Sequence, residues 1–199
     1  MFIEPEITGV NRGWIEVICG SMFSGKTEEL IRRLKRVKIA NRNVELFKPE
    51  IDTRYAINDI VSHNSSAMAG TPVNNSQNIL LLAQDADVIG IDEAQFFDAE
   101  IVHVCETLAN RGMRVIVAGL DMDYLGKPFG PMPQLLAVAD YITKLHAICM
   151  KCGNIASLSY RKIANAEQLL LGESDKYEPR CRKCYAEGME EQKKLLSNK

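Results

Sequence analysis

The sequence predicts an α/β fold in which a parallel sheet is flanked by helices. The apolar segment 14–19 leads into a glycine-rich loop and a helical pattern, and a second apolar strand follows at 44–49. Strand, helix and strand in this order form a βαβ unit, which requires parallel strands. From Cys149 onward the chain changes to short polar segments between cysteines. We therefore expect two domains, 1–148 and 149–199.

The composition is that of a globular protein without a strong charge bias. The 199 residues can bury one full-sized core with a small appendage, and 46% of them are apolar. The net charge of −2 argues against a dedicated nucleic-acid-binding protein, which usually carries a basic excess. The N-terminus shows no signal-peptide pattern, and no apolar run approaches the roughly 20 residues that span a bilayer. We expect a cytoplasmic protein with neither a nucleic-acid nor a membrane partner.

The most specific motif is the segment Gly20-Ser21-Met22-Phe23-Ser24-Gly25-Lys26-Thr27, which fits G-x-x-x-x-G-K-[S/T]. Glycines at its two ends allow the backbone to turn successive N–H groups toward an anion. Lys26 can reach the β- and γ-phosphates, and the Thr27 hydroxyl can bind Mg²⁺. The alternative is a chance match in a glycine-rich turn. A strand before the loop and a helix after it favour a P-loop fold that binds a nucleoside triphosphate at a helix N-terminus.

Apolar periodicity predicts the other elements of the first domain. The helix after the loop places Leu30, Ile31 and Leu34 on one face, whereas residues 50–78 have no clear pattern, as is typical of a functional or mobile segment. The remaining predictions, in chain order, are a short helix at 79–83, a strand at 86–93, a helix at 101–108 with Cys105 in the core, a strand at 114–120, a loop at 121–133, a helix at 135–138, a strand at 141–148 and a solvated or frayed helix from 187.

Two acidic residues end the strand predicted at 86–93. Because the carboxyl ends of parallel strands share one edge of the sheet, Asp92 is expected near the phosphate loop, where it could hold Mg²⁺. Glu93 lies one residue further on and is the candidate general base. The alternative is an acidic strand end in which Asp92 or Asp98 caps a helix. The combination with the phosphate loop favours a nucleotide site.

Four of the six cysteines form two C-x-x-C pairs, Cys149 with Cys152 and Cys181 with Cys184. Two such pairs complete the tetrahedron of thiolates that Zn²⁺ accepts, so structural zinc is favoured over a redox role. The insert between the pairs is longer than in the common zinc ribbon, which suggests that the metal holds the base of a loop. That loop is either a hairpin with a few core leucines or a lid that excludes water from an acceptor.

Together these motifs resemble the tetrameric type of thymidine kinase found in bacteria and animals, over residues 20–185. The phosphate loop is similar to that of the family, with its Met-Phe-Ser-Gly-Lys core. Three further segments resemble family motifs: Lys-Pro-Glu-Ile-Asp-Thr-Arg-Tyr at 48–55, Asp-Glu-Ala-Gln-Phe-Phe at 92–97, and Leu-Asp at 120–121 with Gly-Lys-Pro-Phe at 126–129.

The resemblance implies ATP-dependent phosphorylation of the 5′-hydroxyl of thymidine, with deoxyuridine as a second candidate acceptor, for nucleotide salvage and DNA precursor synthesis. Glu93 would deprotonate the hydroxyl, while Lys26 and Mg²⁺ stabilise the transferring phosphoryl group. A homotetramer, structural zinc on the four cysteines and a lasso-like lid over the nucleoside are also implied. The nucleotide would be bound by residues 20–27 with Asp92, Glu93, Ala94 and Gln95, and the Mg²⁺ by Thr27 and Asp92. The nucleoside would be bound by Met22, Asp52, Arg54, Phe96, Leu120, Tyr124, Phe129, Arg161 and Tyr177.

Three segments depart from the pattern of the family. Residues 122–126 replace the usual Gly-Thr-Phe-Gln-Arg, so that Tyr124 stands in place of phenylalanine and an arginine is lost. Ala94 stands where glycine is frequent, and Leu-Gly-Glu at 171–173 replaces isoleucine and two glycines. These changes leave the chemistry in place and bear on substrate selectivity.

The alternative function is a P-loop ATPase whose zinc module binds nucleic acid. The net charge and the short cysteine module disfavour it, and the aromatic and methionine residues near the acids suit one flat base better than a strand. A nucleotide-regulated interaction protein without turnover is disfavoured because Glu93 stands beside Asp92.

Overall fold

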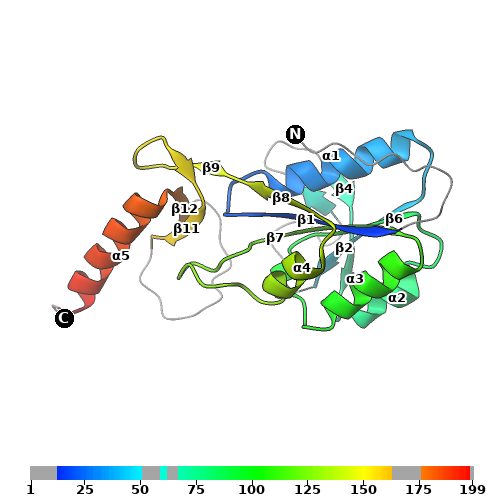
Figure 1. Cartoon of the computed structure of the whole chain (residues 1–199). Helices are drawn as coiled ribbons and strands as arrows, with labels where there is room; N and C mark the ends of the chain where they lie inside the picture. Colours follow the sequence, from blue (N-terminus) through cyan, green and yellow to red (C-terminus); the bar gives the residue numbers. More distant parts are fainter. Residues whose placement is uncertain (1–12, 51–58, 62–66, 163–175, 198–199) are drawn as a thin grey trace.

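The computed structural model describes residues 13–50, 59–61, 67–162 and 176–197. They form a six-stranded sheet with helices on both faces, and a smaller group of strands with the C-terminal helix lies beyond one end of it (Figure 1). The α/β fold predicted from the sequence is confirmed. In the described part of the chain, no helix combines the length and the apolar character needed to cross a membrane.

The main sheet has the strand order β5-β2-β6-β7-β1-β8, and every neighbouring pair is parallel. Its strands are β1 (Trp14–Gly20), β2 (Val44–Pro49), β5 (Thr71–Val73), β6 (Val88–Ile91), β7 (Arg114–Gly119) and β8 (Tyr141–Leu145). Because the strands are parallel, their carboxyl ends share one edge, and the loops that follow β1, β6 and β7 meet there.

Helices cover both faces of this sheet. The helix α1 (Lys26–Ile39) packs on one face, and α2 (Gln77–Leu82), α3 (Ile101–Asn110) and α4 (Met132–Val138) pack on the other. Successive side chains of β1 point to opposite faces of the sheet. Ile18 packs in the core between the sheet and α1, whereas Val17 and Cys19 pack in the core on the other face. Gly90 in β6 allows α1 to approach closely, because a Cβ there would lie 2.7 Å from Cδ1 of Leu34.

The C-terminal group contains two antiparallel pairs of strands. The strand β9 (Ala147–Ile148) pairs with β10 (Ile155–Ala156), and β11 (Leu158–Arg161) pairs with β12 (Tyr177–Arg180). The helix α5 (Arg182–Ser197) follows β12 and extends away from the sheet (Figure 1). A single residue, His146, separates β8 from β9, so this group continues directly from the edge strand of the main sheet.

Two predictions about elements need correction. The strand predicted at 141–148 is two strands in different sheets, because the chain leaves the edge of the main sheet at His146. The unpatterned segment 50–78 contains β5 in the main sheet and the antiparallel pair β3 (Asp59–Val61) and β4 (Ala67–Ala69). Each of these strands has three residues, which is too short for a side-chain period to be visible in the sequence.

Candidate active site

The phosphate loop has the backbone geometry of an anion cradle. Gly20 has a φ of 146° and Gly25 a φ of 85°, conformations that favour glycine. A Cβ on Gly20 would lie 2.3 Å from the carbonyl oxygen of Leu145 in β8, so the position has no room for a side chain. Lys26 begins α1 and donates from Nζ to the carbonyl oxygen of Ser21 at 2.9 Å, which holds its ammonium group across the loop.

Two hydroxyl groups of the loop indicate that a ligand binds here. The Oγ atoms of Ser21 and Ser24 are buried and find no hydrogen-bond partner within the described ranges. A buried hydroxyl without a partner costs about 1–3 kcal/mol, and an anion that accepts its hydrogen bond removes that cost. The N-terminus of α1 and the Lys26 ammonium favour negative charge at the same place. These donors fit the phosphates of ATP.

The acidic pair lies at this loop, as the sequence predicts. Thr27 donates from Oγ1 to Oδ2 of Asp92 at 3.1 Å, which connects the start of α1 with the end of β6. Burial, together with the neighbouring Glu93 carboxylate, raises the pKa of Asp92 to about 7. A hydroxyl and a carboxylate are the oxygen ligands that Mg²⁺ accepts alongside phosphate, so the donor set fits this ion.

Glu93 is held in a strained conformation. Its φ of 52° and ψ of 41° lie in the left-handed region, which costs a residue with a side chain about 1–3 kcal/mol. The Glu93 N–H donates to Oδ1 of Asp92 at 2.9 Å, and Nε2 of Gln95 donates to Oε2 of Glu93. The Oε1 atom of Gln95 accepts the N–H of Leu120 at 2.8 Å. Gln95 thereby fixes the candidate base against the end of β7.

The turn that follows Glu93 is a 3₁₀ helix, η1 (Ala94–Phe96). Ala94 is wholly buried in the core, and Gln95 is 3% exposed. Gln95 supports Glu93 through the hydrogen bond described above, and direct contact of Ala94 and Gln95 with the nucleotide stays a prediction.

The loop after β7 brings two predicted pocket residues, Leu120 and Phe129, close to η1. Phe96 and Phe129 pack edge to face, with ring centroids 5.6 Å apart, and the Leu120 N–H is bound by Gln95. Asp123 shapes the loop, because its Oδ1 accepts the N–H groups of residues 125 and 127 at 2.8 and 3.0 Å. Sequence reasoning missed Asp123, although an aspartate that binds N–H groups two and four residues later is a known turn former.

A second group of predicted pocket residues gathers around Arg161 in β11. Its guanidinium group lies 3.5 Å from the centroid of the Tyr124 ring. Nε and Nη2 of Arg161 both donate to the hydroxyl of Tyr177, at 3.1 and 2.8 Å. The Met22 N–H donates to Oγ of Ser159 at 3.0 Å, which connects the phosphate loop with the same strand. Nothing in the sequence singles out Ser159.

The predicted substrate residues Asp52 and Arg54 lie outside the described residues. The apolar segment of the predicted lid, 169–171, also lies outside them.

The four paired cysteines form one cluster. The Sγ atoms of Cys149, Cys152, Cys181 and Cys184 all lie within 4.8 Å of one another, and those of Cys152 and Cys181 are 3.6 Å apart. Thiolates about 2.3 Å from a tetrahedral zinc ion are about 3.8 Å apart, so this spacing fits zinc. Asn154 donates from Nδ2 to Sγ of Cys152 at 3.4 Å, as groups around a metal ligand often do.

The two other cysteines lie in the core. Cys19 and Cys105 are 1% and 0% exposed, and burial raises their thiol pKa values to about 11 and about 12. The prediction that Cys105 is a core residue is confirmed.

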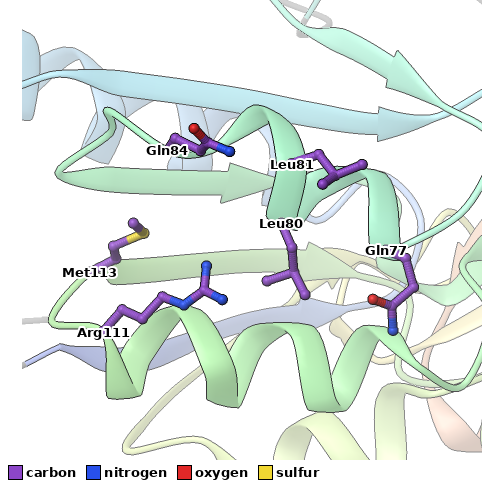
Figure 2. A pocket seen from close by; sticks show the side chains of 6 residues that line it. All are labelled: Gln77, Leu80, Leu81, Gln84, Arg111 and Met113. Carbon is purple, nitrogen blue, oxygen red and sulfur yellow. The ribbon is translucent and has the colours of Figure 1, made fainter.

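An open hollow of about 560 Å³ lies away from these groups, between α2 and the end of α3. Figure 2 shows Leu80 of α2 and Arg111 at the end of α3 pointing into the same space. Arg111 and Met113 come just before β7, so this end of the hollow lies at the amino edge of the sheet, opposite the phosphate loop. Its lining offers neither an acid nor a nucleophile for phosphoryl transfer: Gln77, Leu80, Leu81, Gln84, Arg111 and Met113.

Comparison with known proteins agrees with this site. The family model for thymidine kinase matches residues 13–185. The thymidine kinase of Bacteroides thetaiotaomicron is 62% identical over 186 residues, which cover 93% of this chain and 94% of that protein. The thymidine kinase of Bacteroides fragilis is 60% identical over 192 residues, or 96% of each chain. That of Rhodothermus sp. is 59% identical over 187 residues, which cover 93% of this chain and 88% of that protein.

Among solved structures, domain III of the Thermotoga maritima replication initiation protein DnaA aligns with a TM-score of 0.42 and 16% identity. The alignment covers 69% of this chain and 56% of that one, a likeness too weak to bear on fold or function. The matches in sequence extend over the sheet, the acidic pair and the cysteine cluster alike, and the chain belongs to the thymidine kinase family.

Proposed function

We infer that the protein transfers the γ-phosphoryl group of ATP to the 5′-hydroxyl of thymidine, forming the monophosphate for nucleotide salvage. The observation that carries this inference is the 3.1 Å hydrogen bond between Thr27 and Asp92, because it places the acidic pair at the phosphate loop. Relatives that are about 60% identical over nearly the whole chain are thymidine kinases. A P-loop ATPase with a nucleic-acid-binding zinc module is therefore not favoured.

We propose that Thr27 and Asp92 hold a Mg²⁺ ion beside the phosphates of ATP. When bound, this ion neutralises charge on the phosphate oxygens as the phosphoryl group is transferred. The Lys26 ammonium, which binds the Ser21 carbonyl oxygen in this structure, can move to the phosphates from its place at the start of α1. The buried hydroxyls of Ser21 and Ser24 supply further donors to the same oxygens.

Glu93 is proposed as the general base. Its carboxylate accepts the proton of the 5′-hydroxyl while that oxygen bonds to the γ-phosphorus and ADP departs. The hydrogen bond from Gln95 and the bond from the Glu93 N–H to Asp92 keep the carboxylate in one orientation. Holding the base and the hydroxyl in the reactive geometry lowers the barrier, because the reacting groups no longer have to find that geometry by chance.

The nucleoside pocket is proposed at the carboxyl edge of the sheet, between the loop after β7 and the strand β11. The stacked pair of Arg161 and Tyr124 forms one wall, and the pair of Phe96 and Phe129 forms another. A flat base suits such walls, because aromatic rings and guanidinium groups stack on it. The full proposed set is Met22, Asp52, Arg54, Phe96, Leu120, Tyr124, Phe129, Arg161 and Tyr177.

Domain division, zinc binding and assembly are further parts of the proposal. The division into domains 1–148 and 149–199 is supported by the separate antiparallel pairs that follow His146. The cysteine cluster is proposed to hold one structural zinc ion, and a cluster of thiolates without disulfides suits the reducing cytoplasm. A homotetramer and a lid over the nucleoside follow from the family resemblance. Light scattering of the purified protein would establish the number of chains.

The first experiment incubates purified protein with Mg-ATP and each of the four common deoxynucleosides, and follows monophosphate formation by chromatography. Phosphorylation of thymidine, with or without deoxyuridine in a further assay, supports the proposal. Transfer to purine nucleosides instead would keep the kinase mechanism and reject the substrate. Hydrolysis of ATP that rises with DNA, without transfer to any nucleoside, would establish the alternative function.

A further inference from the structure

A hydrogen bond connects the cysteine cluster with the loop after β7. Tyr185 follows Cys184 in the first turn of α5, and its hydroxyl donates to the carbonyl oxygen of Tyr124 at 2.7 Å. The N–H of Tyr185 donates to the carbonyl oxygen of Cys181 at 2.9 Å. The side chain is therefore fixed at its base by the cysteine-bearing turn and at its tip by the loop.

The loop backbone lies closely against the tip of Tyr185. Gly126 has a φ of 71°, and a Cβ built there would lie 3.7 Å from the Tyr185 hydroxyl oxygen and 3.6 Å from Cδ2 of Leu158. The loop between Asp123 and Lys127 therefore rests on groups of the C-terminal unit. The position of this loop relative to the sheet therefore depends on where α5 begins.

The same helix also holds the partner of Tyr124. Arg161 lies over the Tyr124 ring at 3.5 Å, and Gln192 of α5 donates from Nε2 to the Arg161 carbonyl oxygen at 2.7 Å. One helix thus binds both residues of the stacked pair through their backbone carbonyl groups. Tyr185 binds Tyr124 in the loop, and Gln192 binds Arg161 in β11. The two bonds start from the same rigid element, so they fix the two halves relative to each other.

We propose that Tyr185 is a positioning residue for the nucleoside, acting through Tyr124 without contact with the substrate itself. Its hydroxyl selects the loop position in which the Tyr124 ring stacks under Arg161 and completes one wall of the pocket. This inference rests on the proposed place of Tyr124 and Arg161 in the nucleoside site. Without the bond the loop occupies additional positions, and the apparent affinity for thymidine falls in proportion to the fraction of molecules that retain the competent one.

The test is Tyr185→Phe, which keeps the ring and removes only the hydroxyl. We expect the KM for thymidine and its Kd by calorimetry to rise about threefold to tenfold, the range that loss of one ordinary hydrogen bond produces. The kcat value and the KM for ATP should stay within about twofold of the parent, because Lys26, Thr27 and Glu93 lie outside this contact. A merely structural role would lower stability without this split between thymidine KM and kcat.

The matched control is Tyr160→Phe. The Tyr160 hydroxyl donates to the carbonyl oxygen of Gly188 in α5 at 3.2 Å, so the control removes the same kind of bond within the same unit. The Tyr160 ring, which packs edge to face against Tyr185 with centroids 6.2 Å apart, is kept. Zinc content and melting temperature are measured for both variants. A thymidine KM that rises in Tyr185→Phe and not in Tyr160→Phe supports the proposal. No rise in Tyr185→Phe, or an equal rise in both, overturns it.

A second variant covers the case in which Tyr185→Phe loses zinc or fails to fold. Gln192→Met removes the bond to Arg161 from a half-buried position further along α5. The same selective rise in thymidine KM is expected, because this bond fixes the Arg161 half of the stacked pair to the same helix, and an unchanged KM overturns the proposal that α5 positions the pair. The parent protein is assayed first: if it does not phosphorylate thymidine, the proposed function fails, whereas an active parent with an unaltered Tyr185→Phe variant rejects only this inference.

Discussion

Glu16 of β1 carries a wholly buried charge. Three side chains donate to its carboxylate: Arg33 from Nη1 at 2.6 Å, Arg114 from Nε at 2.6 Å and Trp14 from Nε1 at 2.7 Å. The side chains of Arg33 and Arg114 are 0% and 8% exposed. The change Glu16→Gln keeps the shape of the side chain and removes its charge, so that both guanidinium groups face a neutral amide.

The expected loss of unfolding free energy is about 4 kcal/mol. Removal of one partner from a buried ion pair costs about 3–5 kcal/mol, because the other charge stays buried without compensation. The loss should not double for two arginines, since Arg33 keeps its bonds to Glu29 at 2.8 Å and to Thr143 at 2.9 Å. A domain of this kind has a total stability of about 5–15 kcal/mol, so the Glu16→Gln variant should lose roughly a quarter to four fifths of it.

The measurement is urea unfolding followed by far-UV circular dichroism, at one protein concentration and with saturating zinc. Both conditions are fixed because bound metal and assembly shift the apparent stability. Glu29→Gln is the control: Glu29 binds the same Arg33, but its side chain is 18% exposed, and the expected loss is below about 1 kcal/mol. A loss for Glu16→Gln below about 1 kcal/mol, or no larger than that of the control, would refute the reasoning.

Four further predictions concern catalysis, packing, pH and metal. Glu93→Gln should lower kcat by about 10²- to 10⁴-fold in the thymidine assay and leave ATP binding nearly intact, and near-normal turnover would rule Glu93 out as the base. Gly90→Ala should lower the unfolding free energy by about 1–3 kcal/mol, because its Cβ would meet Leu34 and Leu46 at 2.7 and 2.8 Å; an unchanged melting curve would show that these side chains move aside. The hydrogen bond from Arg32 lowers the pKa of Glu29 below its ordinary 4.5, so this carboxylate stabilises the fold above that pH and loses the effect as the pH falls. The stability difference between the parent and Glu29→Gln should therefore shrink on acidification from about pH 6 to pH 3 in denaturation curves, and a difference that grows would contradict the assignment. Mass spectrometry of carefully purified protein should find close to one zinc per chain, and far less would count against the cysteine site.

The strongly patterned elements could be predicted from the sequence alone. The strands β1, β6 and β7 read as largely apolar runs, apart from Glu16 in β1 and Arg114 at the start of β7, because a parallel sheet buries both of its faces. The helices α1 and α3 were visible because their apolar residues recur with helical spacing. Short strands such as β5 could not be predicted, since three residues show no period and the pairing with β2 depends on tertiary contacts.

Some parts of the candidate site could likewise be predicted from the sequence, and others could not. The phosphate loop and the cysteine cluster were predictable because their chemistry demands particular residue types at particular spacings. The bonds that position the pocket join groups 137, 61 and 25 residues apart in sequence: Met22 with Ser159, Tyr185 with Tyr124, and Leu120 with Gln95. One partner in each bond is a backbone group, which every residue type carries. Such contacts therefore leave little trace in the sequence.

The contact between Gly20 and Leu145 has a consequence for directed evolution. Gly20 opens the phosphate loop, and it also lies against the last residue of β8, the strand that continues into the cysteine-bearing unit. Any side chain at this position would push β8 outward and so disturb the nucleotide cradle and the attachment of the C-terminal unit together. In a library randomised at Gly20, every variant that alters nucleotide binding would then also weaken the attachment of the C-terminal unit. Searches for altered phosphoryl-donor preference would do better to randomise Ser21 and Ser24, whose buried hydroxyls have no hydrogen-bond partner among the described residues.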